Sequence, residues 1–74
     1  MKKRFLNTGT ITKASRGRDI LRRNGIAAYV QAARGSLSSS GCGYGIIIGS
    51  STLERAIRLL KTAGIEISGI VALD

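Results

Sequence analysis

The chain contains one cysteine, Cys42, and no histidine. Small residues surround Cys42, so its sulfur should be approachable and the nearby backbone adaptable. A lone cysteine cannot form an internal disulfide and, without histidine, cannot complete a Cys/His zinc site. Cysteine hydrolases normally pair the nucleophile with a histidine base, so that chemistry is disfavoured too. We expect no metal, no cofactor and no enzymatic activity, and a thiol that carries an atom or group.

The residues around Cys42 form a serine- and glycine-rich loop. It leads into the apolar segment Gly45-Ile46-Ile47-Ile48-Gly49. Two interpretations stay open: a plain flexible loop that tolerates a cysteine, or a nest of backbone N–H groups that holds an anionic adduct. The Gly-Lys-Ser/Thr ending of a phosphate-binding Walker loop is absent. The residues expected to shape the loop are Ser38, Ser39, Ser40, Gly41 and Gly43.

Basic residues are concentrated in the first part of the chain. The net charge is +8, and residues 1–43 contain nine basic residues and one acidic residue. Positive charge near a thiol favours its thiolate form, and a basic surface attracts an anionic partner. The residues expected to favour the thiolate or to dock a partner are Lys2, Lys3, Arg4 and Arg34. An alternative basic face, or simply a solvated helix surface, comprises Arg16, Arg18, Arg22 and Arg23.

The 74 residues predict a single domain over residues 1–74. A hydrophobic content of 43% is too high for a disordered chain, yet no apolar run is long enough to cross a bilayer. The basic N-terminus lacks the apolar core of a signal peptide. We expect a cytoplasmic protein with a reduced thiol and no membrane association, for which dimerisation would add stability.

Apolar spacing predicts two helices that end in the same way. Ser51-Thr52-Leu53-Glu54 fits a capping box and opens a helix over 51–63, which Gly64 ends. An earlier helix over 15–24 ends at Gly25 and contains Gly17, which weakens it by about 1 kcal/mol. Asp19 of this helix is expected to contact Arg22 and Arg23. The matching segments 20–26 and 59–65 indicate a duplicated unit.

Strands are expected around these helices, at 5–12, at 26–33, in the apolar segment after the cysteine loop, and at 65–68 with an apolar tail beyond Gly69. This order predicts a ferredoxin-like βαββαβ α+β sandwich, a four-stranded antiparallel sheet with two helices on one face. We expect the first and third strands to lie side by side and parallel. That would bring Lys2, Lys3 and Arg4 near Cys42 and place both helix N-termini at the other end of the sheet.

Nucleic acid is a less favoured partner. RNA-binding sheets of this topology stack bases on aromatic residues of the two central strands, where Phe5 and Tyr44 are expected. A basic module that docks on an acidic protein or nucleic acid, with Cys42 incidental, is the second hypothesis. A regulatory domain that binds a small ligand through the glycine-rich loop is the third.

The stretch Ser36-Leu37-Ser38-Ser39-Ser40-Gly41-Cys42-Gly43-Tyr44-Gly45-Ile46, with the helix and the Ala63-Gly64-Ile65 step that follow, resembles the selenium/sulfur carrier-like family of small bacterial domains. The likeness spans roughly residues 12–71. It implies that Cys42 holds a sulfur or selenium atom, for example as a persulfide, and passes it between donor and acceptor proteins. Related sulfur-relay carriers use a Cys-Pro-x-Pro motif, whereas this chain contains no proline. From the family itself it departs by an extra glycine between Ser40 and Cys42 and by its strongly basic N-terminal half.

Overall fold

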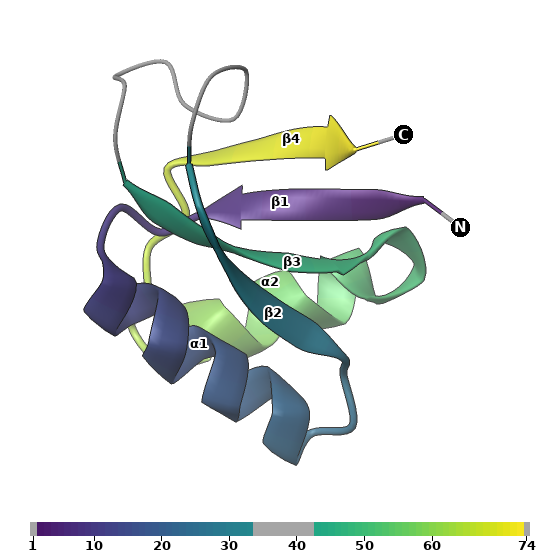
Figure 1. Cartoon of the computed structure of the whole chain (residues 1–74). Helices are drawn as coiled ribbons and strands as arrows, with labels where there is room; N and C mark the ends of the chain where they lie inside the picture. The colour runs from purple at the N-terminus through teal and green to yellow at the C-terminus, as the bar shows by residue number, and fades with distance from the viewer. Residues whose placement is uncertain (1, 34–42, 74) are drawn as a thin grey trace.

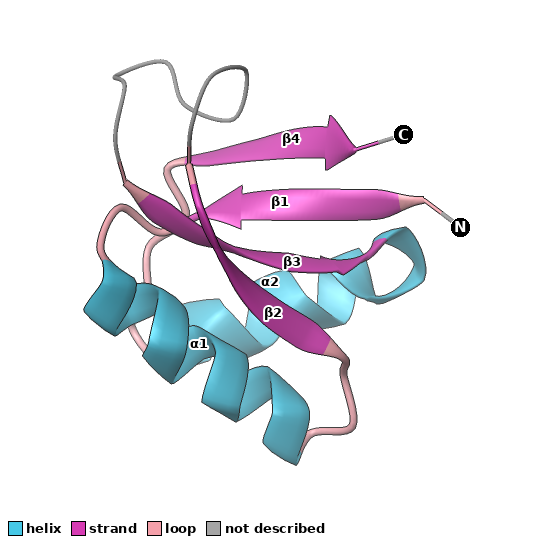
Figure 2. Ribbon diagram, in the orientation of Figure 1, coloured by secondary structure: helices cyan, strands magenta, loops and turns pink. Residues whose placement is uncertain are grey.

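The computed structural model describes residues 2–33 and 43–73. Their elements follow the predicted order and form a ferredoxin-like α+β sandwich, with both helices on one face of the sheet (Figures 1 and 2). The elements are β1 (Lys3–Asn7), α1 (Ile11–Arg23), β2 (Ala28–Ala32), β3 (Tyr44–Gly49), the short 3₁₀ helix η2 (Ser50–Thr52), α2 (Leu53–Thr62) and β4 (Gly69–Leu73).

The sheet has the strand order β2-β3-β1-β4, and all neighbouring strands are antiparallel. The expectation that the first and third strands run parallel is therefore wrong. The α1 crossover returns the chain so that β2 runs in the direction of β1, and β3, which follows β2 and pairs with it, must run the opposite way. As a result Asn7 at the end of β1 lies opposite Gly45, and Lys3 at its start lies opposite Gly49.

The core lies between the sheet and the helices. The helix-facing side of the sheet contributes Leu6, Ala28, Ile46 and Ile48, which are at most 1% exposed. Gly17 of α1 faces this layer: a Cβ there would lie 2.6 Å from Ile46 Cδ1. Gly17 therefore lets α1 approach the sheet closely, a packing role that the propensity argument alone did not predict.

α1 begins earlier than expected, and the strand before it is shorter. The predicted strand over 5–12 ends at Asn7, and the helix begins at Ile11. Gly9 adopts φ +93°, a conformation that turns the chain out of the sheet. Thr10 then caps the helix, because its hydroxyl accepts the Lys13 N–H at 3.2 Å.

The two helices end in the same hydrogen-bonded motif, as their shared sequence pattern predicted. At the end of α1, Gly25 has φ +79° and the Ile26 N–H donates to the Leu21 carbonyl at 2.9 Å. Gly64 and Ile65 repeat this arrangement after α2, with φ +77° and a 2.9 Å bond. Both are Schellman motifs, which turn the chain back toward the sheet and bury the isoleucine.

The start of α2 and the final strand differ in detail from the prediction. The expected capping box does not form, since η2 precedes α2 and the Thr52 hydroxyl donates to the Gly49 carbonyl at 2.9 Å instead. Residues 65–68 are a connection, not a strand, and β4 begins at Gly69. The Ile65 N–H is occupied by the helix-ending bond, so pairing with β1 starts only where the Ser68 N–H donates to the Asn7 carbonyl at 2.8 Å.

Candidate functional site

The segment that contains Cys42 begins and ends at one point of the structure. Residues 34–42 lie outside the described residues, and they include the predicted site residues Arg34, Ser38, Ser39, Ser40, Gly41 and Cys42. The flanking residues Ala33 and Gly43 are joined, because the Ala33 N–H donates to the Gly43 carbonyl at 2.8 Å. The segment is therefore attached at both ends beside the start of β3.

The turn between β1 and α1 holds this attachment point. The N–H groups of Thr8 and Gly9 donate to the Tyr44 carbonyl at 3.1 and 3.0 Å, and the Thr8 hydroxyl donates to the same oxygen at 3.1 Å. Gly43 has φ +142°, and a Cβ there would lie 3.3 Å from the Gly9 carbonyl oxygen. Of the loop residues singled out in the sequence, Gly43 is the one described, and its conformation and close packing both favour glycine.

The N-terminus of α1 lies at this end of the sheet, next to the end of β1 (Figure 1). Helix N-termini carry partial positive charge from unpaired backbone N–H groups, and they favour anions such as a thiolate. The first turn of α1 adds the cation Lys13 and contains no acidic residue. The expectation that both helix N-termini lie at the far end is therefore wrong for α1, because β1 runs toward the attachment point.

Lys2, Lys3 and Arg4 lie at the opposite end of the sheet. The antiparallel register pairs Lys3 with Gly49 and Arg4 with Ile48, at the far end of β3 from Gly43. The Ser50 N–H also donates to the Lys2 carbonyl at 3.0 Å, which fixes Lys2 beside η2. The prediction that these three residues approach the start of β3 is therefore wrong, and it failed with the assumption of parallel central strands.

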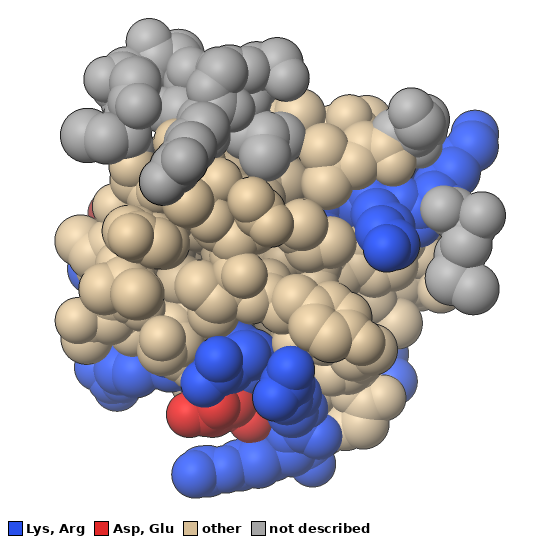
Figure 3. Space-filling view, in the orientation of Figure 1, with Lys and Arg blue, Asp and Glu red and all other residues tan. Residues whose placement is uncertain are grey.

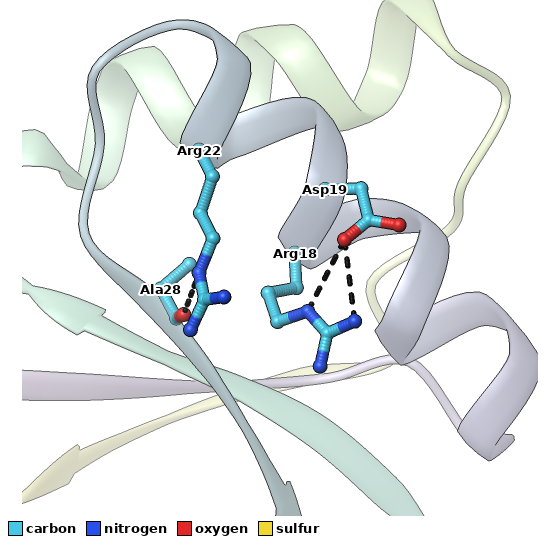
Figure 4. A network of polar contacts seen from close by, with 4 residues as sticks. All are labelled: Arg18, Asp19, Arg22 and Ala28. Carbon is cyan, nitrogen blue, oxygen red and sulfur yellow. Dashed lines mark hydrogen bonds and ion pairs between the residues drawn. The ribbon is translucent and has the colours of Figure 1, made fainter.

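The arginines of α1 make local contacts that differ from the expected ones. Arg18, not Arg22 or Arg23, binds Asp19, with Nη2 to Oδ1 at 3.2 Å (Figure 4). Arg22 instead donates from Nε to the Ala28 carbonyl at 3.0 Å, and its guanidinium lies over the Tyr29 ring at 5.6 Å from the centroid.

Arg16 and Arg23 are exposed. In the view of Figure 3, basic side chains gather over α1 and, separately, beside the N-terminal end of β1. Two of the four α1 arginines, Arg18 and Arg22, are engaged in local contacts, and their role in docking a partner stays a prediction.

Comparison with known families matches residues 6–72 to the family described as "Putative Se/S carrier protein-like". The chain belongs to this family. No curated protein and no solved structure matched it. Membership of a carrier family favours the carrier hypothesis over the basic binding module with an incidental cysteine.

Phe5 and Tyr44 of this Se/S carrier-like domain do not form the base-stacking surface of the less favoured RNA-binding alternative. Phe5 is 0% exposed, and Tyr44 lies on the helix-facing side, packed against the core. The prediction that Phe5 and Tyr44 could stack bases is therefore wrong. The exposed aromatic residue of the described sheet is Tyr29, at 57%.

Within residues 2–33 and 43–73, no three of the side chains that commonly bind metals come together. The helices in the same ranges are too short or too polar to cross a membrane.

Sequence reasoning missed Asn7, Thr10 and Lys13 of this Se/S carrier-like domain, which lie in or directly after the turn beside Gly43. The run Asn7-Thr8-Gly9-Thr10 carries the signal: asparagine and glycine favour a turn, and threonine favours a helix N-cap. In the structure, Asn7 Oδ1 accepts the Gly9 N–H at 3.0 Å within this turn. Because the run was assigned to a strand, the start of α1 was predicted too late in the sequence.

Proposed function

We propose that this chain carries a sulfur or selenium atom on Cys42 and transfers it from a donor protein to an acceptor protein. Family membership over residues 6–72 is the observation that carries this proposal. The chain then acts stoichiometrically and needs no bound cofactor. Because a carrier thiol must stay reduced between cycles, the proposal places the protein in the cytoplasm.

The geometry of the attachment point supports a thiolate at Cys42. Gly43, which follows Cys42 directly in the sequence, is packed against Gly9 in the turn that leads into α1. Two sources of positive potential follow that turn, the N-terminus of α1 and the cation Lys13 in the first turn of the helix. In our proposal they replace Lys2, Lys3 and Arg4 as the groups that favour the thiolate, while Arg34 and the serines remain proposed partners within the segment.

The proposed reaction is redox-neutral. The Cys42 thiolate attacks the outer sulfur of a persulfide on a donor cysteine, a bond forms between Cys42 Sγ and that sulfur, and the donor S–S bond breaks. The donor sulfur leaves as a thiolate, and the transferred sulfur keeps its proton, so Cys42 becomes a persulfide. A nucleophile of the acceptor then attacks the outer sulfur and releases the Cys42 thiolate. Selenium in place of the outer sulfur follows the same steps.

Intact-mass measurement after incubation with a persulfide donor tests the proposal. We expect the wild-type chain to gain the mass of one sulfur atom and to lose it again when a reductant is added. Cys42→Ser is the matched control, since it removes the only thiol and keeps the size and polarity of the side chain. A wild-type chain that gains no sulfur, or a Cys42→Ser chain that gains as much, contradicts the proposal.

A further inference from the structure

A concavity opens on the side of the sheet that the helices leave uncovered, at the end far from Gly43. Its volume is about 320 Å³, within the range of small-ligand sites. The side chains of Lys3, Tyr29 and Ile47 share this side of the sheet, since Lys3 pairs with Gly49 and Tyr29 with Ile47. The lining residues are Lys3, Ala27, Tyr29, Ile47, Ile48, Gly49, Ser51 and Thr52.

Tyr29 supplies an aromatic surface that is held in place yet open. Arg22 lies over the ring at 5.6 Å from its centroid, and Arg22 is itself fixed by its bond to the Ala28 carbonyl. Tyr29 nevertheless remains 57% exposed, so a planar group has room to contact the ring. A ring presented beside an arginine is a stacking surface that accepts any nucleobase.

A cation and a hydroxyl group lie beside this aromatic surface. Lys3 is exposed and lines the concavity, and no acidic residue is among the described residues that line it. Ser51 adds a hydroxyl group to the lining, whereas the Thr52 hydroxyl already donates to the Gly49 carbonyl. The site therefore offers a stacking ring, a cation and a hydrogen-bonding group within one small volume.

We infer that this concavity binds a nucleotide unit, with the base against Tyr29 and the phosphate beside Lys3. The net charge of +8 favours a ligand with repeated negative charge, such as a unit of a single strand, and a free nucleotide presents the same chemistry. The site is separate from the point where the cysteine segment is attached. It lies at the start of β1, whereas Gly43 lies near the end of β1, roughly 15 Å away for a strand of this length.

Binding is tested on the full chain with a fluorescein-labelled single-stranded oligonucleotide, by fluorescence anisotropy at fixed salt. Tyr29→Ala removes the stacking ring at constant net charge, and Gln31→Ala is its control, because Gln31 is an exposed residue of the same strand. Stacking of one base on an aromatic ring contributes about 1–3 kcal/mol of binding free energy, so we expect Tyr29→Ala to weaken binding about tenfold or more. Gln31→Ala should leave the affinity unchanged.

A second variant, Gly49→Leu, fills the concavity without removing any side chain. Gly49 has φ −74°, which any residue can adopt, and a Cβ there would have no neighbour within 4 Å. We expect this variant to stay folded by circular dichroism and to bind about tenfold more weakly.

Lys3→Glu should weaken binding more than Lys61→Glu, which makes the same charge change on α2, outside the residues that line the concavity.

Uridine monophosphate serves as the second probe, and its binding is monitored through the backbone amide chemical shifts of the protein. Shifts at Tyr29 and Gly49 support a site for a free nucleotide, and oligonucleotide binding alone with the same variant effects supports a site for one unit of a strand. Either result must persist in Cys42→Ser, which separates this site from the proposed carrier function. The inference is overturned if neither probe binds, if Tyr29→Ala and Gly49→Leu bind like wild type, or if poly-glutamate binds equally well with the same sensitivity to both variants.

Discussion

At the scale of single residues, two glycines of β3 show how differently the same residue type is used. A Cβ at Gly45 would overlap the Leu6 carbonyl oxygen and the Phe5 ring, which crosses over this position. Gly49, four residues later, faces open space. Gly45 is therefore required for the packing of β1 on β3, whereas Gly49 leaves the concavity beside Tyr29 open.

Gly45→Ala should destabilise the domain by about 2 kcal/mol or more, because a backbone oxygen and a buried ring must both move. Gly49→Ala on the same strand is the control and should change the free energy of unfolding by less than about 0.5 kcal/mol. Urea unfolding of the two variants makes the comparison. Equal stabilities would show that β1 and β3 are not packed as described.

Single residues also mark where sequence reasoning succeeded and where it could not. Both helix-ending glycines were identified from their Gly-Ile pattern, because the left-handed backbone there requires glycine. The contacts of Gly17 and Gly45 were not predictable, since the side chains that fill the space come from elements distant in sequence. The partner of Asp19 was also missed: helical spacing offered Arg22 and Arg23, and Arg22 is drawn instead to the Ala28 carbonyl.

At the scale of elements, strand direction decides which charges lie beside the point where the cysteine segment is attached. Element order alone predicted the ferredoxin-like fold, since two strand-helix-strand units of this length pack in few ways. The relative direction of β1 and β3 was predicted incorrectly. The predicted positions of the basic N-terminal residues and of the α1 N-terminus depended on that direction, so they were wrong too. With the antiparallel register, the N-terminus of α1 replaces the basic N-terminal residues at the attachment point.

Lys13→Glu tests this assignment. The variant replaces a cation by an anion in the first turn of α1, where an acidic residue also suits the helix dipole, so the fold should be preserved. We expect alkylation of Cys42 by iodoacetamide to slow about two- to fivefold at neutral pH, because less thiolate is present.

Lys3→Glu is the matched control for that experiment, since it makes the same charge change at the far end of β1. It should leave the alkylation rate close to that of wild type. If Lys3→Glu slows the reaction and Lys13→Glu does not, the thiolate is stabilised from the other end of the sheet and our assignment is wrong.

At the scale of the whole molecule, one small core supports both proposed sites. Leu60 of α2 is 0% exposed, and it also accepts the Ile65 N–H bond that ends the helix. A domain of this size has a total stability of about 4–11 kcal/mol. The loss of one central side chain should therefore remove a large share of it.

Leu60→Ala should lower the free energy of unfolding by about 3 kcal/mol, while Leu59→Ala, at the half-buried neighbouring position, should cost less. Thermal and urea unfolding of the two variants provide the measurement. A larger loss for Leu59→Ala would mean that α2 presents a different face to the sheet.

The most direct test of the central claim is whether sulfur loaded on this chain can be passed on. Protein carrying one added sulfur is purified away from the donor and mixed with one equivalent of a small thiol, and both species are followed by mass spectrometry. Our account predicts that the chain returns to its original mass at the rate at which the thiol gains one sulfur, and that Cys42→Ser never enters the cycle. Sulfur that remains on the chain in the presence of the thiol, or that is taken up and released without Cys42, would contradict it.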